Sequence, residues 1–281
     1  MKTDLKGYVE RIRAGKFDEA REYKNSFVPS TLYKFYALFD NGYKNYNVRN
    51  KERFTALKQN QVWLSVFDKF NDPFEAKVLI LNEAKLAANG WNPKQIETAR
   101  FIMYMISKVF CITSLSANFN ACMPMWAHYA NNHHGFCVEY KITNPNLIFE
   151  VSYEGERQLC ATLIANMMAL APDLSTHATT DYSPEFMEYV ALLSFSHCVK
   201  HSSWKYENEY RVFSPEMLPK GSGVLRPCSE LGLQPIRIFA GLACEPKNLI
   251  TLKQIGARIG CPVAQMIQSD MTDYCLGFKT L

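Results

Sequence analysis

Two glutamates separated by a single residue, Glu207 and Glu209, are the side chains in this sequence best suited to chemistry. They lie within residues 204–213, where aromatic and β-branched residues alternate with charged ones. This alternation predicts one β-strand that carries both carboxylates on the same face, about 7 Å apart. Two carboxylates at this spacing can act together on one ligand, as acid, base or stabiliser of positive charge. The alternative interpretation is a solvated strand face on which Lys205 and Arg211 neutralise the acids.

A second candidate is the segment that contains Trp126, His128 and Tyr129 and is followed closely by His133 and His134. A helix that binds a metal through two histidines places them four residues apart, and the step from His128 to His133 is one residue longer. Adjacent histidines also point in different directions. We therefore predict no metal site here. A histidine or aromatic ring that borders a ligand pocket is one interpretation, and an ordinary packed aromatic pair is the other.

Two further strands carry polar groups in apolar surroundings. Lys34 lies among aromatic residues of a predicted strand, so its ammonium must reach solvent, pair with an acid or contact a ligand phosphate. Ser114 and Ser116 fall on one face at the end of another predicted strand. They are suited to a polar pocket wall, or they cap the backbone where the strand ends.

The composition excludes several classes of protein. Hydrophobic residues make up 48% of the chain and charged residues 21%, as in an ordinary globular protein. The net charge of +4 is too small to indicate nucleic-acid binding by itself. The nine cysteines form no Cys-x-x-Cys pair, which removes support for zinc-ribbon and thioredoxin-like sites and favours a reducing, cytoplasmic location.

Common nucleotide and hydrolase motifs do not occur in the sequence. It contains no Gly-rich dinucleotide or phosphate loop, no Gly-x-Ser-x-Gly and no His-Glu-x-x-His. The N-terminus lacks the apolar segment of a signal peptide. The longest apolar run, residues 161–171, is too short to cross a bilayer, so we expect a core helix there and no association with membranes.

Many short strands with interspersed helices predict an α+β fold with mixed, mostly antiparallel central sheets and surrounding helices. We expect a helical appendage at residues 1–30 and a single α+β domain of catalytic type at residues 31–281. Strands are predicted for residues 32–38, 61–65, 76–81, 109–116, 136–140, 148–153, 204–213, 236–241, 262–266 and 274–279. Helices are predicted for residues 51–59, 93–108, 125–130, 157–171, 184–201 and 247–258.

Five separated motifs resemble, in order, an uncharacterised bacterial domain family of unknown function. They are Leu-Tyr-Lys-Phe at 32–35, Phe-Asn-Asp-Pro-Phe at 70–74, Trp-Ala-His-Tyr-Ala at 126–130, Gly-Phe-Cys-Val-Glu at 135–139 and Trp-Lys-Tyr-Glu-Asn-Glu-Tyr-Arg at 204–211. The resemblance runs from about residue 30 to the C-terminus and does not itself supply a function.

A weaker resemblance is to the ADP-ribosyltransferases. Those enzymes show a basic or His residue on a first strand, a Ser-x-Ser or Tyr element on a middle strand and a late Glu-x-Glu. In this chain Lys34, Ser114 with Ser116, and Glu207 with Glu209 look like these elements in the same order. The resemblance implies a split β-sandwich and NAD as the substrate, without a metal.

The same resemblance implies a role for each residue. Glu209 stabilises the positive charge that develops when the bond between nicotinamide and ribose breaks, and Glu207 orients or deprotonates the acceptor. Lys34 holds a phosphate, the two serines line the ribose pocket, and an aromatic ring stacks on the nicotinamide. The implied NAD-binding residues are Tyr33, Lys34, Ser114, Ser116, Trp126, His128 and Tyr129.

The leading hypothesis is therefore an NAD-dependent ADP-ribosyltransferase-like enzyme, such as a bacterial toxin or phage-defence effector. Its acceptor is a protein or a nucleic acid, and an antitoxin or inhibitor protein is an expected partner. The first alternative is a non-catalytic regulatory module that binds a nucleotide or nucleic acid. The second is a hydrolase or nuclease that uses the carboxylates with a divalent ion.

Overall fold

A computed structural model of the chain describes residues 5–40, 42–74, 77, 79–109, 111–119, 123–159, 197–214, 221–269 and 275–281. Its α-helices are α1 (Leu5–Arg13), α2 (Phe17–Asn25), α3 (Tyr46–Lys58), α4 (Glu83–Ala88), α5 (Pro93–Val109), α6 (Met123–Tyr129) and α9 (Pro246–Ile259), and its 3-10 helices are η1 (Phe67–Lys69), η2 (Pro145–Leu147), η3 (Ser202–Glu207) and η4 (Cys228–Leu231). Its strands are β1 (Thr31–Tyr36), β2 (Gln61–Val66), β3 (Leu79–Ile80), β4 (Cys111–Ser116), β5 (Phe136–Ile142), β6 (Ile148–Glu150), β7 (Ser152–Glu154), β8 (Gln158–Leu159), β9 (Val199–His201), β10 (Glu209–Ser214), β11 (Gly223–Pro227), β12 (Leu233–Ala240), β13 (Val263–Gln268) and β14 (Leu276–Thr280).

The fold is α+β with a mostly antiparallel central sheet, which confirms the predicted fold class. The main sheet has the strand order β11-β2-β4-β1-β5-β12-β13-β14, and β10 and β6 extend it beside β4. Within this sheet only β12 and β13 run parallel. Two small parallel pairs, β3 with β8 and β7 with β9, complete the described strands.

The main sheet divides at β4. One edge of β4 pairs with β10 along its whole length. The other edge pairs with β2 at Cys111 and Ile112 and with β1 at Ser116. Between these points β1 and β2 diverge, and no described strand pairs with residues 113–115 along that edge. The sheet therefore contains a fork whose floor is the middle of β4.

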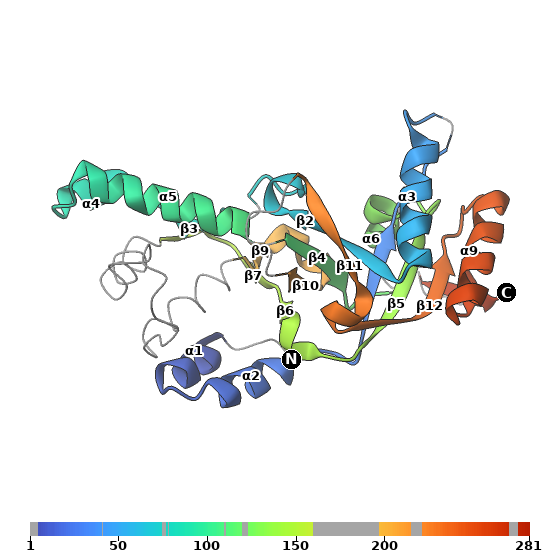
Figure 1. Ribbon diagram of the computed structural model, residues 1–281, viewed down its shortest axis with the longest axis horizontal. Coiled ribbons are helices and arrows are strands. Elements are labelled where there is room, and N and C mark those ends of the chain that lie inside the picture. Colours follow the sequence, from blue (N-terminus) through green and yellow to red (C-terminus); the bar gives the residue numbers. More distant parts are fainter. Residues whose placement is uncertain are drawn as a thin grey trace.

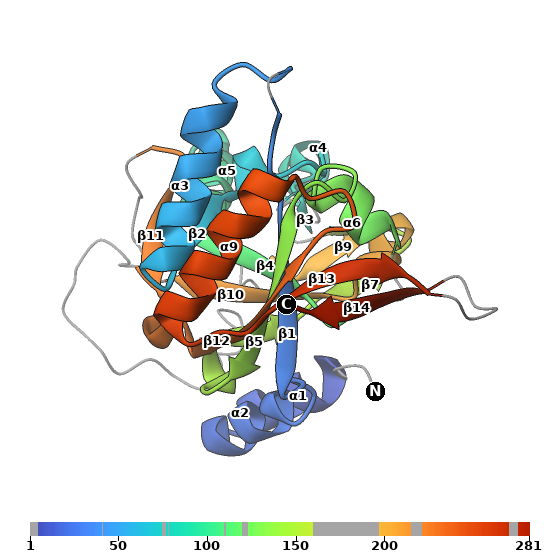
Figure 2. The same cartoon turned by 90° about the vertical axis from the view of Figure 1, so that its right-hand side faces the viewer.

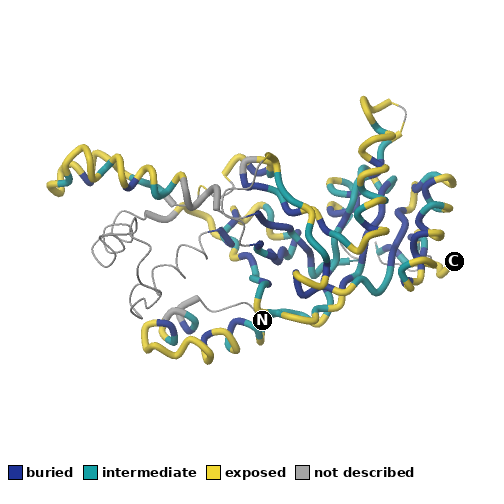
Figure 3. Tube along the Cα trace, in the orientation of Figure 1, coloured by how far each residue is buried: buried dark blue, intermediate teal, exposed yellow. Residues whose placement is uncertain are grey.

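Helices α3 and α9 lie side by side across the strands, where α3 contacts β2 and α9 contacts β12 and β13 (Figure 2). Helices α4 and α5 extend away at the other end of the molecule (Figure 1). Buried residues, dark blue in Figure 3, concentrate along the strands. Leu32, Leu64 and Val138 are fully buried in the main core cluster. Burial of one such side chain contributes about 1.5–3 kcal/mol, so the strands that form the fork are held firmly.

The described N-terminal segment is helical, and a buried lysine helps to attach it to the sheet. Helices α1 and α2 pack against each other below the sheet (Figure 1). The ammonium of Lys24 donates hydrogen bonds to the carbonyl oxygens of Pro145, Asn146 and Ile148 at 2.8, 3.1 and 2.8 Å. These bonds join α2 to η2 and β6.

The prediction of one strand over residues 204–213 is wrong. Residues up to Glu207 form the 3-10 helix η3, Asn208 adopts a left-handed conformation with a φ of 43°, and β10 begins at Glu209. Asn tolerates this conformation better than most residues. The amide of Asn118 donates to the carbonyl of Tyr206 at 2.9 Å, which satisfies a backbone group that a strand partner would otherwise bind. Tertiary contacts therefore outweigh the alternating pattern.

Two other predictions fall largely outside the described residues. These are the helices at residues 157–171 and 184–201, including the apolar run 161–171. At their described ends the chain forms β8 and β9 instead. None of the helices in the described ranges has both the length and the apolar character that crossing a bilayer requires.

A close backbone approach fixes the start of β5 beside β1. A Cβ added to Gly135 would lie 2.0 Å from the carbonyl oxygen of Tyr36 and 2.9 Å from that of Ala130. We expect Gly135→Ala to lower the free energy of unfolding by about 1–3 kcal/mol, because the strand must move away from its neighbour. Gly155→Ala is the matched control, since its Cβ meets no atom within 4 Å. Equal denaturation midpoints for the two variants would contradict this account.

Candidate functional site

A cavity of about 960 Å³ lies in the fork of the sheet. Its walls come from β1, β2, β4, α3 and α6, and one side is closed by Lys200, η3 and the start of β10. The volume falls within the range of about 300–1,000 Å³ that is usual for small-molecule and cofactor sites. We call this cavity the fork cavity. The polar residues of its lining that matter below are Lys34, Ser114, Tyr129, Lys200, Glu207 and Glu209.

Glu209, the first residue of β10, is only 3% exposed and has three charged or hydroxyl donors. Ser114 Oγ and Arg211 Nε donate to Oε1 at 2.5 and 2.9 Å, and Lys200 Nζ donates to Oε2 at 3.2 Å. Burial acts to raise the pKa of this carboxyl. The charges of Arg211 and Lys200, together with the hydrogen bonds, outweigh burial and lower the pKa to about 2. Glu209 is therefore ionised at neutral pH.

Glu207, the last residue of η3, is also only 3% exposed but has a different environment. Lys200 Nζ donates to its Oε2 at 2.6 Å, and the hydroxyl of Tyr129 donates to its Oε1. Burial raises the pKa of Glu207, the negative charge of Glu209 raises it further, and Lys200 only partly opposes them. Two neighbouring carboxyls whose pKa values are driven apart are suited to different roles in acid–base chemistry.

The interpretation of this segment as a solvated strand face is wrong, because both carboxylates and Arg211 are buried. Lys205, which that interpretation paired with the acids, is exposed on η3. The cation that contacts both carboxylates is Lys200, the middle residue of β9.

Lys34 connects β1 to the floor of the fork. Its Nζ donates to the carbonyl oxygen of Ser114 at 3.1 Å, at a point where β4 has no strand partner on that edge in the described residues. Burial lowers the pKa of Lys34 to about 8, although the charge of Glu209 opposes the shift. The ammonium form still predominates at neutral pH. Lys34, Ser114 and Glu209 thus form a continuous hydrogen-bonded series across β1, β4 and β10.

The structure brings most of the predicted site residues together, with some of their polar groups already engaged. Ser116 lines the fork cavity, but its Oγ donates to the carbonyl of Glu207 at 2.6 Å. Tyr33 also lines it, while its hydroxyl donates to Glu139 at 3.1 Å. His128 lies on the cavity wall and is exposed.

Trp126 is the predicted site residue that does not line the fork cavity. It is fully buried in a second core cluster, where its ring packs edge-on against Phe35 with centroids 5.1 Å apart. The interpretation of Trp126 as a stacking surface for nicotinamide is therefore corrected. Tyr129, three residues further along α6, does line the cavity.

Sequence reasoning missed several charged and aromatic residues of the cavity, among them Lys200, Trp63, Arg49 and Arg53. The sequence did not identify Lys200 as a site residue, because it lies at the end of a segment predicted as a helix. Trp63 of β2 is 41% exposed and supplies an aromatic surface that Trp126 does not. Arg49 and Arg53 of α3 also line the cavity. Their four-residue spacing places them on one face of α3, but the predicted helix began at residue 51 and left Arg49 outside it.

Comparison with known proteins is consistent with the predicted relationship. Residues 125–212 match the model of a family described as protein of unknown function (DUF2971). This match confirms the resemblance to an uncharacterised domain family, and it spans most of α6, all of β5 and η3 and most of β10, including both carboxylates. No curated protein and no solved structure matches the chain.

The low pKa of Glu209 has a consequence for stability. Its folded-state pKa of about 2 is below the ordinary value of 4.5, so the ionised group stabilises the fold above that ordinary value. The contribution is lost as the pH falls towards about 2. We expect the free energy of unfolding to decline more steeply between about pH 5 and pH 2 in the natural protein than in Glu209→Gln. Urea titrations across this range test the difference, and parallel curves would contradict the assignment.

Proposed function

We propose that this protein is an NAD-dependent ADP-ribosyltransferase-like enzyme that uses the fork cavity as its active site. The observation that carries the proposal is the hydrogen-bonded series from Lys34 through Ser114 to Glu209. It joins a first-strand cation, a middle-strand serine and a late-strand glutamate in one cavity. The family to which residues 125–212 are similar has no assigned activity, so the proposal stands on this geometry.

The two carboxyls have distinct roles in the proposed reaction. NAD supplies a glycosidic C–N bond that breaks with the electron pair leaving on nicotinamide. Glu209, which is held ionised, stabilises the positive charge that develops on the ribose. Glu207 accepts the proton that the acceptor nucleophile loses as it bonds to the same carbon, and the raised pKa of Glu207 suits a general base. Tyr129 and Lys200 hold Glu207 in place.

Cations and aromatic rings around the cavity suit the other parts of a dinucleotide. Lys34, Arg49 and Arg53 lie on its walls and can bind phosphate oxygens. Trp63 and Tyr129 offer rings for stacking on nicotinamide or adenine.

The cysteines in the described part of the chain are all free, which suits a cytoplasmic setting. We extend the proposal to a toxin or phage-defence effector that modifies a protein or nucleic acid and is controlled by an inhibitor protein. Incubation with NAD labelled in the adenylate moiety, with and without bacterial lysate, tests it. The expected result is release of nicotinamide and transfer of the label to a macromolecule. If nicotinamide is not released and no label is transferred, the proposal is overturned.

A second candidate is a non-catalytic module that binds a nucleotide. The specific observation in its favour is that Lys200 and Arg211 already neutralise both carboxylates, as in a structural ion-pair network. This candidate predicts saturable NAD binding by calorimetry with no nicotinamide release.

Metal-dependent hydrolysis has less support, because the ammonium of Lys200 lies between the two carboxylates at the position that a divalent ion would take. Activity that EDTA abolishes would favour this reaction over ADP-ribosyl transfer.

A further inference from the structure

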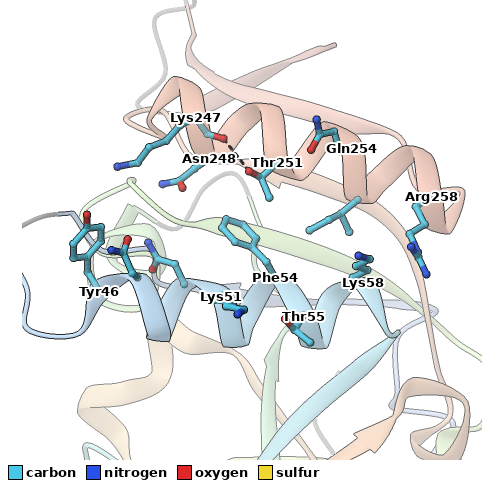
Figure 4. A pocket seen from close by; sticks show the side chains of 13 residues that line it. Tyr46, Lys51, Phe54, Thr55, Lys58, Lys247, Asn248, Thr251, Gln254 and Arg258 are labelled. Atoms are coloured by element: carbon cyan, nitrogen blue, oxygen red, sulfur yellow. Dashed lines mark hydrogen bonds between the residues drawn. The ribbon is translucent and has the colours of Figure 1, made fainter.

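A second concave surface lies on the opposite face of α3 from the fork cavity. Arg49, Arg53 and neighbouring residues of α3 face the fork, whereas Lys51, Thr55 and Lys58 face α9. Between α3 and α9 lies a groove of about 810 Å³. Figure 4 shows Tyr46 and Lys247 at one end of this groove and Lys58 and Arg258 at the other. We call it the helical groove.

Basic side chains recur along both walls of the helical groove. Lys51 and Lys58 are seven residues apart on α3, so they lie two turns apart on one face. On α9, Lys247, Thr251 and Arg258 share one face by the same periodicity. Arg258 lies eleven residues after Lys247, a separation of roughly 16 Å along the helix. A ligand that follows the groove therefore meets a cation at each end and along one wall.

The helical groove has an unbalanced positive charge. None of the residues that line it is acidic. Helix α9 has three basic residues and no acidic one. Lys247 pairs with Glu245 at 2.9 Å, but in the described part of the chain Lys51, Lys58 and Arg258 form no ion pair and are exposed.

Helix stability explains only part of this arrangement. Lys58 and Arg258 lie in the last turns of their helices, where a cation is favoured by the helix dipole. Lys247 lies in the first turn of α9, where that same dipole disfavours a cation. Lys51 lies at neither end of its helix. The dipole therefore accounts for two of the four groove cations and the ion pair with Glu245 for Lys247, so Lys51 is the groove cation that these effects do not explain.

We propose that the helical groove binds the phosphate backbone of a single-stranded nucleic acid. Its length is sufficient for about four or five nucleotides at a rise of about 3.4 Å each, near the lower limit of known single-strand sites. Tyr46 at one end provides a ring on which a base can stack. A recessed groove between two helices suits one single strand with stacked bases better than it suits a membrane surface.

The test is binding of a fluorescein-labelled 12-nucleotide single strand, measured by anisotropy at several salt concentrations without NAD. This readout does not depend on catalysis in the fork cavity. The double variant Lys58→Gln/Arg258→Gln removes two groove cations. The control Lys141→Gln/Lys253→Gln removes two exposed cations that do not line the groove, so the two variants have equal net charge.

The expected result is binding by the natural protein and the control, and about tenfold weaker binding by the groove variant. The slope of log K against log salt should also become shallower by about 1.4, which corresponds to two lost phosphate contacts. Thermal unfolding of both variants shows whether each is folded, and Lys51→Gln serves if the double variant is not. The proposal is overturned if the natural protein does not bind the single strand, or if both double variants lose the same amount of affinity for it. It is also overturned if the natural protein binds poly-glutamate or anionic phospholipid vesicles as tightly as the single strand.

Discussion

Exchange of Glu209 for Gln is expected to abolish NAD turnover, with a rate at least about 10²–10³-fold lower than that of the natural protein. A neutral amide cannot stabilise the positive charge that develops on the ribose. The same change removes the carboxylate charge beside buried Arg211, while Lys200 keeps its ion pair with Glu207, and breaking a buried ion pair in this way costs about 3–5 kcal/mol. Nicotinamide release and urea denaturation, measured on the same sample, give both quantities.

Because stability falls as well, a second variant is needed to separate catalysis from folding. Ser114→Ala removes the hydroxyl that donates to Glu209 but leaves both cations in place. It should lower turnover about tenfold, the equivalent of one hydrogen bond to a charged group, while the protein remains folded. Glu230→Gln, an exposed acid on η4, is the control for charge alone. Unchanged nicotinamide release by a folded Glu209→Gln protein would refute the assignment of this residue.

The elements that were predicted well are those whose local pattern agrees with their tertiary environment. Strand β1 carries buried Leu32 and Phe35 among residues of high strand propensity. Helix α5 begins where Asn92 and Gln95 bond to each other's backbone, as a capping box does. In these segments propensity, capping and burial all favour the same structure, so a single sequence is sufficient.

The segment before β10 shows why the rest was not predictable. Its alternating residues satisfy a strand pattern, but the backbone is bound by Ser116 and Asn118, which lie about 90 residues earlier and on a different strand and loop. The local sequence around residues 204–208 does not indicate these hydrogen bonds to distant residues. Glu207 and Glu209 are nevertheless close together, as predicted. They flank the left-handed residue Asn208, and the ammonium of Lys200 contacts both carboxylates.

The predicted site was incomplete for a related reason. Periodicity assigns residues to faces of one element, but it does not show where two strands separate. The fork between β1 and β2 decides which side chains share a cavity, and it arises from pairing at the two ends of β4. Trp126 and Trp63 illustrate the result: the first is in the core and the second is on the cavity wall.

Lys200→Met is expected to shift the pH dependence of turnover as well as its size. Lys200 is the cation that opposes the effects of burial and of Glu209 on the pKa of Glu207. Its loss raises that pKa further, so a general base at this position loses its proton only at higher pH. The acidic limb of the pH–rate profile should therefore move upwards. Glu209 remains ionised because Arg211 still contacts it.

The same variant should make the stabilising effect of acid near neutral pH larger, at a pH above the range in which Glu209 titrates. A carboxyl whose folded-state pKa is raised destabilises the fold when it is ionised, so protonation of Glu207 should restore part of the about 3–5 kcal/mol lost with Lys200. In the natural protein Lys200 limits the rise in the pKa of Glu207, so this effect is smaller, and the loss of stability due to Glu209 begins only below about pH 5. Lys205→Met, which removes an exposed lysine from the same 3-10 helix, should keep the natural profile in both measurements. If Lys200→Met lowers turnover but leaves the acidic limb in place, Lys200 only holds the structure and does not set the protonation of Glu207.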